Sequence, residues 1–155
     1  MANKRRYFKS SPRPLIQQKV ALCSAYKGAC CSIDKKNNQL YWSGKIKPTA
    51  LSKEYTVVLV YQPGKSPKVW VVGDELEKMD DSNFPHKYNI DANSKVVRIC
   101  LYRYSEFNST KLLANTIIPW TVEWLYFYEL WLATGEWLGG GEHPDVGKPK
   151  TDDSD

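Results

Sequence analysis

Histidine and cysteine, the residues that hold most structural zinc ions, are few in this chain. The sequence has two histidines, His86 and His143, and four cysteines without a repeated Cys-x-x-Cys spacing. A zinc site is therefore not expected, and no cofactor is predicted. A disulfide between the adjacent Cys30 and Cys31 would be strained, so we expect the cysteines to be free thiols of a reducing compartment.

Long apolar runs are also missing from the sequence. No stretch approaches the roughly eighteen apolar residues that suggest a membrane span. The basic start leads into Ser10, Ser11 and Pro12 without the apolar core of a secretory signal. The sequence therefore predicts a cytoplasmic protein with no membrane partner.

The formal net charge is +5, and it is unevenly distributed, with a basic beginning and an acidic end. A basic terminus suits an acidic partner, an anionic membrane surface or nucleic acid, and it is also typical of a solvated, partly disordered tail. Since no longer basic stripe follows, nucleic acid is not expected as a partner. We predict a basic flexible segment over residues 1–13, one domain over 14–144 and a polar acidic tail over 145–155.

Helical spacing appears twice in the predicted domain. Apolar residues recur at this spacing over residues 14–26, with Gly28 placed to end the helix and Cys23 expected on its buried face. A second, strongly aromatic run spans residues 119–135, opened by proline and closed by glycine. Its apolar residues cover most of the helix circumference, so this helix is either buried or meets a partner on its second face.

Strand patterns lie between the two helices. Residues 39–46 alternate with period two, and the β-branched runs 55–61 and 68–72 follow after short turns. These three runs predict an antiparallel meander. Residues 73–93 show no period and are expected to form a long loop, which leads into a short apolar strand over 95–102. The fold class is therefore predicted to be α+β.

Few residue patterns point to chemistry. The sequence has no Gly-rich phosphate loop, Gly-x-Ser-x-Gly elbow or zincin helix. Glu123 and Glu129 do not share one helix face, so a carboxylate pair is not indicated. A cysteine nucleophile remains, because thiolates form thioesters that are reactive enough for a second acyl transfer to an amine.

Cys100 is the preferred cysteine. The strand after the long loop is expected to deliver it to the surface, where a bulky acyl donor would reach it. Cys23 is expected to be packed in a helix face, and Cys30 and Cys31 are expected in a polar linker without a nearby base. A small buried hydrophobe stays as the alternative role for Cys100.

His86 is the histidine nearest to the Cys100 strand in sequence. It either supports the reaction, by orienting the acceptor or assisting the acyl intermediate, or holds the loop in shape through hydrogen bonds to the backbone. Asn89, Tyr88 and Tyr102 are candidate hydrogen-bond donors for a developing oxyanion, and the sequence does not select one.

Four runs of the second half carry a resemblance to a known family. They are Phe84–Tyr88, Ile99–Tyr102, Ile118–Trp131 and the Gly-Glu-Trp-Leu-Gly-Gly-Gly-Glu-His-Pro ending at 135–144. Together they resemble the short ubiquitin-conjugating-enzyme-like proteins of bacterial type II CBASS anti-phage operons. The resemblance implies a ubiquitin-conjugating-enzyme-like fold, with the β-meander flanked by an N-terminal helix and C-terminal helices.

The resemblance also implies a reaction and a partner. Cys100 would carry the C-terminus of a cGAS/DncV-like nucleotidyltransferase as a thioester and pass it to an amine, which primes anti-phage cyclic-nucleotide signalling. The alternative is a catalytically inactive binding module for the nucleotidyltransferase. Conventional conjugating enzymes carry His-Pro-Asn before the cysteine, whereas Pro85 here precedes His86. No nucleotide-binding fingerprint is present, so the sequence does not indicate how Cys100 becomes charged.

Overall fold

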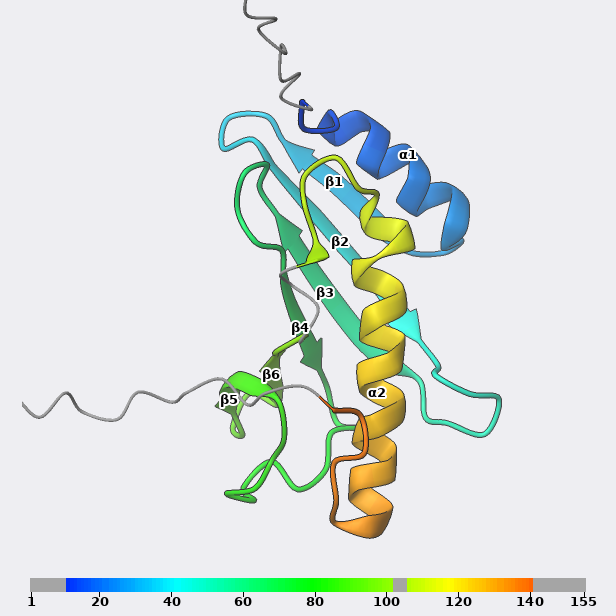
Figure 1. Cartoon of the computed structure of the whole chain (residues 1–155), viewed down its shortest axis with the longest axis vertical. Coiled ribbons are helices and arrows are strands. Elements are labelled where there is room, and N and C mark those ends of the chain that lie inside the picture. Colours follow the sequence, from blue (N-terminus) through cyan, green and yellow to red (C-terminus); the bar gives the residue numbers. More distant parts are fainter. Residues whose placement is uncertain (1–10, 102–105, 141–155) are drawn as a thin grey trace, which may run out of the picture.

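The computed structural model of the chain describes residues 11–101 and 106–140, and these ranges form an α+β fold (Figure 1). Six strands make one antiparallel sheet in the order β1-β2-β3-β4-β6-β5. The elements in chain order are α1 (Leu15–Ala25), β1 (Cys30–Asp34), β2 (Gln39–Ile46), β3 (Tyr55–Tyr61), β4 (Lys68–Val72), β5 (Lys87–Asp91), β6 (Val96–Ile99), the 3-10 helix η2 (Leu113–Asn115) and α2 (Ile117–Thr134).

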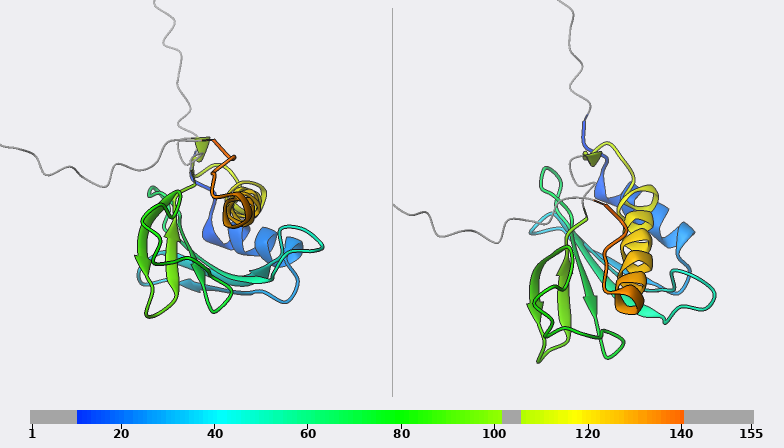
Figure 2. Two further views of the ribbon diagram at one scale, coloured as in Figure 1. Left: turned by 90° about the horizontal axis from the view of Figure 1, so that it is seen from below. Right: turned by 60° about the horizontal axis from the view of Figure 1, so that its bottom comes forward.

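The three predicted strands are confirmed as β2, β3 and β4. In β3 every second side chain from Tyr55 to Tyr61 is buried, as the alternation of the pattern indicates. Both helices lie on the same face of the sheet and cover these inward side chains (Figure 2). The core of the fold is therefore one layer between the sheet and the two helices.

The sheet extends beyond the predicted meander on both sides. The linker expected around Cys30 and Cys31 is wrong, because these residues begin β1 and pair with β2. Part of the loop expected over 73–93 is also wrong, because Lys87–Asp91 forms β5 and pairs with β6. Both strands lie at an edge of the sheet, where polar residues are tolerated and a strong apolar pattern is absent.

Helix α1 turns a different face to the core than its apolar pattern predicts. Its buried residues are Leu15, Gln18 and Leu22, whereas Ile16 and Val20 are each 59% exposed. The buried position of Cys23 is a wrong prediction, since one further residue rotates the side chain about 100° away from Leu22.

The buried side chain of Gln18 holds α1 to the segment before α2. Its amide nitrogen donates to the Lys111 carbonyl at 2.8 Å, and its amide oxygen accepts the Leu113 backbone N–H at 2.9 Å. A buried amide is stable only when its polar groups are paired in this way. The first helix is thus fastened to a part of the chain that is distant in sequence.

Helix α2 begins two residues before the expected proline. Pro119 is its third residue, a position whose backbone N–H has no partner inside a helix. Gly135 closes the helix as predicted, with φ +78° and its N–H bonded to the Trp131 carbonyl at 2.8 Å. Several C-terminal helices were expected, but the described residues show this single α-helix, preceded by η2.

The segment between β4 and β5 is fastened to α2 by Tyr128. The Tyr128 hydroxyl donates to the Glu77 carbonyl at 3.0 Å and accepts the Glu77 backbone N–H at 2.8 Å. Phe84 packs against the same helix, with ring centroids 5.5 Å from Tyr128 and 5.4 Å from Trp131. These contacts fix the stretch of chain that leads to His86.

Some predictions lie outside the described residues. They concern most of the basic segment 1–13, the acidic tail 145–155, Tyr102 and His143. The limits of the domain stay a prediction, as does the cytoplasmic location. Neither helix within the described ranges combines the length and apolarity that a membrane crossing requires.

We expect the substitution Tyr128→Phe to lower the free energy of unfolding by about 1–3 kcal/mol, because it leaves both backbone groups of Glu77 without their partner. Urea denaturation measures this change. Tyr126→Phe is the matched control, since Tyr126 lies on the same helix with an exposed side chain and should lose almost nothing. Equal losses in the two variants would contradict the anchoring role of Tyr128.

Candidate functional site

Cys100 follows directly after the last residue of β6. Its backbone N–H donates to the His86 carbonyl at 2.8 Å, so the pairing of the β5–β6 hairpin continues past the assigned strand ends. The side chain was expected at the surface, but the residue is only 7% exposed. Cys100 is buried because α2 and the residues after it lie over the end of the strand. Sequence periodicity does not show such packing between distant segments.

His86 joins the hairpin to α2 through its backbone. Its carbonyl accepts the Cys100 N–H and also the indole N–H of Trp124 at 3.1 Å. The residue adopts φ +44°, a left-handed conformation that is uncommon outside glycine. Its ring is buried 4.7 Å from the ring of Trp137. These bonds are made by the backbone of His86, so both roles weighed for its side chain stay predictions.

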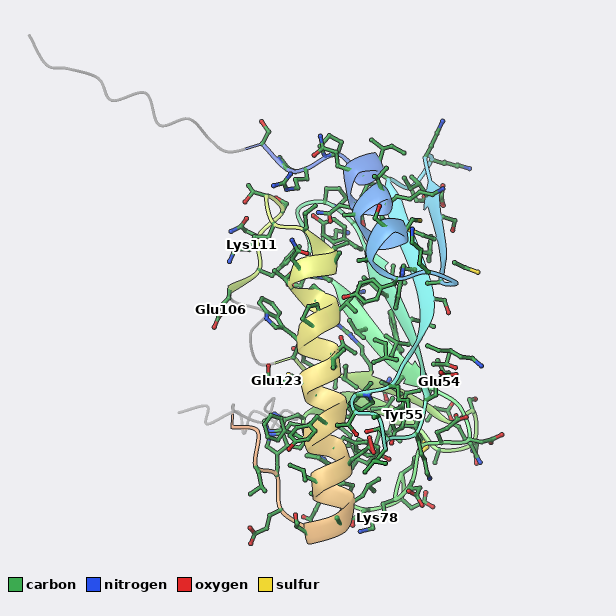
Figure 3. The ribbon with its side chains drawn as sticks, turned by 90° about the vertical axis from the view of Figure 1, so that its right-hand side faces the viewer. Glu54, Tyr55, Lys78, Glu106, Lys111 and Glu123 are labelled. Atoms are coloured by element: carbon green, nitrogen blue, oxygen red, sulfur yellow. The ribbon has the colours of Figure 1, made fainter. Side chains whose placement is uncertain are left out.

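A narrow pocket lies beside the cysteine. It is lined by His86, Cys100, Leu101, Trp120, Glu123, Trp124, Phe127, Trp137 and Gly139. The cavity volume of about 20 Å³ is room for about one water molecule, so an organic cofactor would not fit as the pocket stands. Glu123 is the acidic residue of the lining, and in Figure 3 it lies on the opposite side of α2 from Tyr55.

Residues 136–140, which we name the cover segment, fold back along α2 after Gly135 (Figure 1). Trp137 donates its indole N–H to the Gly140 carbonyl at 2.9 Å and packs 5.8 Å from Trp124. A side chain at Gly139 would come within 2.7 Å of the Phe127 ring, so only glycine fits this close approach. The cover segment therefore closes one side of the pocket by tight packing.

The surroundings of Cys100 shift the pKa of its thiol in opposite directions. Burial raises the pKa of the Cys100 thiol, while a hydrogen bond with the Tyr88 hydroxyl and the positive charge of Arg98 lower it in part. The net direction is upward, so the thiol is mostly protonated at neutral pH. Tyr88 is thus a candidate donor with a contact to the cysteine, while Asn89 is an exposed residue opposite Arg98 and Tyr102 lies outside the described residues.

Of the other cysteines, Cys30 and Cys31 lie in the edge strand β1, and Cys23 lies in α1 beside it. Cys23 and Cys30 are exposed, and Cys31 hydrogen-bonds with Cys23. Burial and the neighbouring Cys23 raise the pKa of Cys31 to about 11. Within residues 11–101 and 106–140, no three His, Cys, Asp or Glu side chains converge in a way that would hold a metal ion.

Glu123 and Trp137 are residues of the pocket that the sequence interpretation did not assign. Glu123 shares a helix face with Trp120, Trp124 and Phe127, and this spacing of three and four is the signal that would have grouped them. Trp137 lies in the glycine-rich run that carries the family resemblance. Its place beside His86 depends on the backward turn at Gly135, which the sequence alone does not orient.

Fold and site together define a class: a small α+β domain whose antiparallel hairpin ends in a cysteine held against an aromatic helix. Comparison with protein families identifies the class more closely. The family of type II CBASS E2 proteins matches residues 18–144, so the chain belongs to that family, which confirms the resemblance of its motifs. A comparison with curated proteins found no match. Membership implies an E2-like, conjugating-enzyme role in CBASS anti-phage defence and association with CBASS components.

We expect Trp137→Ala to increase the rate at which iodoacetamide alkylates Cys100 several-fold, because it removes the ring that packs on His86 and Trp124 over the pocket. Mass spectrometry of the Cys100 peptide measures this rate. Leu138→Ala is the control, since the adjacent Leu138 is exposed and should leave the rate unchanged. Identical rates for Trp137→Ala and the parent protein would show that the cover segment does not protect the thiol.

Proposed function

We propose that this protein is a cysteine-dependent conjugating enzyme, with Cys100 as the acyl carrier. It would take the C-terminus of a cGAS/DncV-like nucleotidyltransferase as a thioester and transfer it to an amine, in the cytoplasm and on a ubiquitin-conjugating-type fold. The observation that carries the proposal is the position of Cys100, which lies at a strand end beside a hydrogen-bond donor and a pocket with a carboxylate. No other cysteine of the described residues lines this pocket.

The chemistry requires two acyl transfers at the same sulfur. In the first, the Cys100 thiolate attacks an activated acyl donor, forms the S–C bond and releases the activating group. In the second, an amine attacks the thioester carbonyl, the C–S bond breaks and the thiolate returns. The sequence has no phosphate-binding loop, so we assign activation of the carboxylate to another protein.

Burial of the thiol is compatible with a thioester if the cover segment moves. The segment is held by ring packing and by the Trp137 indole bond to the Gly140 carbonyl. A flexible C-terminal peptide, which needs little width, is the kind of acyl donor that would enter a narrow opening of this sort. The movement would also bring the acceptor amine toward the pocket.

We assign to Glu123 the binding and deprotonation of the acceptor amine. Glu123 lines the pocket, and in this role its carboxylate would attract an incoming ammonium group and accept a proton as the amine attacks. The second carboxylate of the helix, Glu129, lies away from this pocket, near Thr49 and Leu51. The two residues therefore form a natural pair of test and control.

A second function has one observation in its favour. The Cys100 thiol is buried and its pKa is raised, which is also the behaviour of a structural cysteine. In that case the protein would be a catalytically inactive module that binds the nucleotidyltransferase. The two functions differ in whether a covalent bond to Cys100 forms.

We expect expression together with the whole operon, so that the activating protein is supplied, to give a covalent adduct with the nucleotidyltransferase at the summed mass on a non-reducing gel. The adduct should disappear with reductant or hydroxylamine, since both cleave a thioester, while a disulfide resists hydroxylamine. Cys100→Ala should abolish the adduct, and Cys23→Ala, which removes an exposed thiol, should not. Co-purification without an adduct would instead support the binding module.

We expect Glu123→Gln to slow the discharge of the Cys100 thioester to an amine by about tenfold to a hundredfold, in the range of general-base effects. Formation of the thioester should be little changed, because the carboxylate is assigned to the acceptor. Single-turnover discharge followed on gels separates the two steps. Glu129→Gln should behave as the parent protein, and equal discharge rates for all three proteins would remove Glu123 from the mechanism.

A further inference from the structure

Tyr88 lies at an irregularity of the sheet. In the pairing of β5 with β6, Lys87 is opposite Ile99 and Asn89 is opposite Arg98, so Tyr88 is an extra residue in its strand. Such a β-bulge turns the side chain of the extra residue out of the regular alternation. The bulge is two residues after His86, whose carbonyl binds the Cys100 backbone N–H. The irregularity thus lies beside the cysteine.

Arg98 holds the ring of Tyr88 from the neighbouring strand. Its guanidinium carbon lies 4.8 Å from the centre of the Tyr88 ring, which is a cation–π arrangement. Arg98 is opposite Asn89 on β5 and opposite Trp70 on β4, so its backbone is paired on both sides. The ring is 44% exposed, and the contact with the arginine limits its movement toward solvent.

The Tyr88 hydroxyl meets the sulfur of Cys100 in a side-chain hydrogen bond. A phenol donates its proton to a thiolate more strongly than to a neutral thiol, because hydrogen bonds with a charged partner are stronger. The other titratable or charged side chains near Cys100 among the described residues are His86 and Glu123, which line the pocket, and Arg98 on β6. The Tyr88 side chain is hydrogen-bonded to the sulfur and also has an exposed side that solvent reaches.

We propose that Tyr88, set by the β-bulge and held by Arg98, is the hydrogen-bond donor that stabilises the Cys100 thiolate. The thiolate forms twice in the proposed reaction. It is the nucleophile when the S–C bond forms, and it is the leaving group when the amine nitrogen bonds to the carbonyl carbon and the C–S bond breaks with its electron pair on sulfur. The proton of the amine goes to solvent or to Glu123. Arg98 acts through Tyr88 and by its charge, as a positioning residue.

The role of Tyr88 in acyl transfer rests on the proposed function. Its role in the ionisation of the Cys100 thiol does not. We therefore test ionisation first, on the isolated full chain. The rate of iodoacetamide alkylation of the Cys100 peptide is followed by mass spectrometry across a pH series. Tyr88→Phe removes one oxygen and keeps the ring, so the cation–π contact with Arg98 is retained.

The expected result for Tyr88→Phe is an upward shift of the alkylation midpoint by about half to one pH unit, because the thiolate loses a donor. Arg98→Gln should shift the midpoint in the same direction, since it removes the positive charge that favours the thiolate. Tyr41→Phe is the matched control, because Tyr41 is also exposed and bonds to Gln39 on β2. A Tyr88→Phe midpoint equal to that of the parent protein overturns the proposal.

The second measurement concerns transfer. Tyr88→Phe loaded with the acyl group should discharge to hydroxylamine several-fold more slowly than the parent protein, because its leaving thiolate is less stable. If the parent protein forms no thioester, the proposed function fails, and the alkylation midpoints still decide the ionisation role of Tyr88. If thioester forms and the Tyr88→Phe midpoint does not move, the proposal on Tyr88 fails and the conjugating function stands.

Discussion

One carbonyl group connects the parts of this molecule on which its site depends. The oxygen of His86 accepts the N–H of Cys100 from the hairpin and the indole N–H of Trp124 from α2. His86 accepts both bonds in a left-handed conformation, directly before the first residue of β5. The end of β6 and helix α2 are therefore held at a fixed separation by this carbonyl. The pocket, the cover segment and Cys100 lie next to it.

The site combines a thiol that burial makes weakly acidic with groups that partly restore its acidity. Removing Cys100 from water favours the neutral form, while a phenol and a guanidinium nearby favour the thiolate. Such a balance, together with burial of the thiol, limits the reaction of Cys100 with small electrophiles in solution. The aromatic rings around the pocket exclude water from the thiol, and they also stabilise the fold by packing on one another.

How far the sequence predicts this structure differs from element to element. Strand β3 is predicted because each inward side chain is apolar, whereas β5 is missed because an edge strand such as Lys87–Asp91 needs no such pattern. The buried face of α1 is misplaced because Ile16 and Val20 are apolar yet exposed. Cys100 is predicted as the nucleophile from its place at the end of an apolar run and from the family resemblance, and that role stays a prediction. Its burial depends on residues after α2, which no local pattern connects to it.

The buried amide of Gln18 also sets an order of events while the chain is being synthesised. Its two partners lie 93 and 95 positions further along, so the ribosome must release nearly the whole domain before α1 obtains them. Strands β1 to β4 pair with their immediate neighbours in sequence and form as they emerge. The hydrogen bonds that fasten the first helix are therefore among the last contacts of the fold to form, whereas the packing of this helix on β1 needs only residues that are made directly after it.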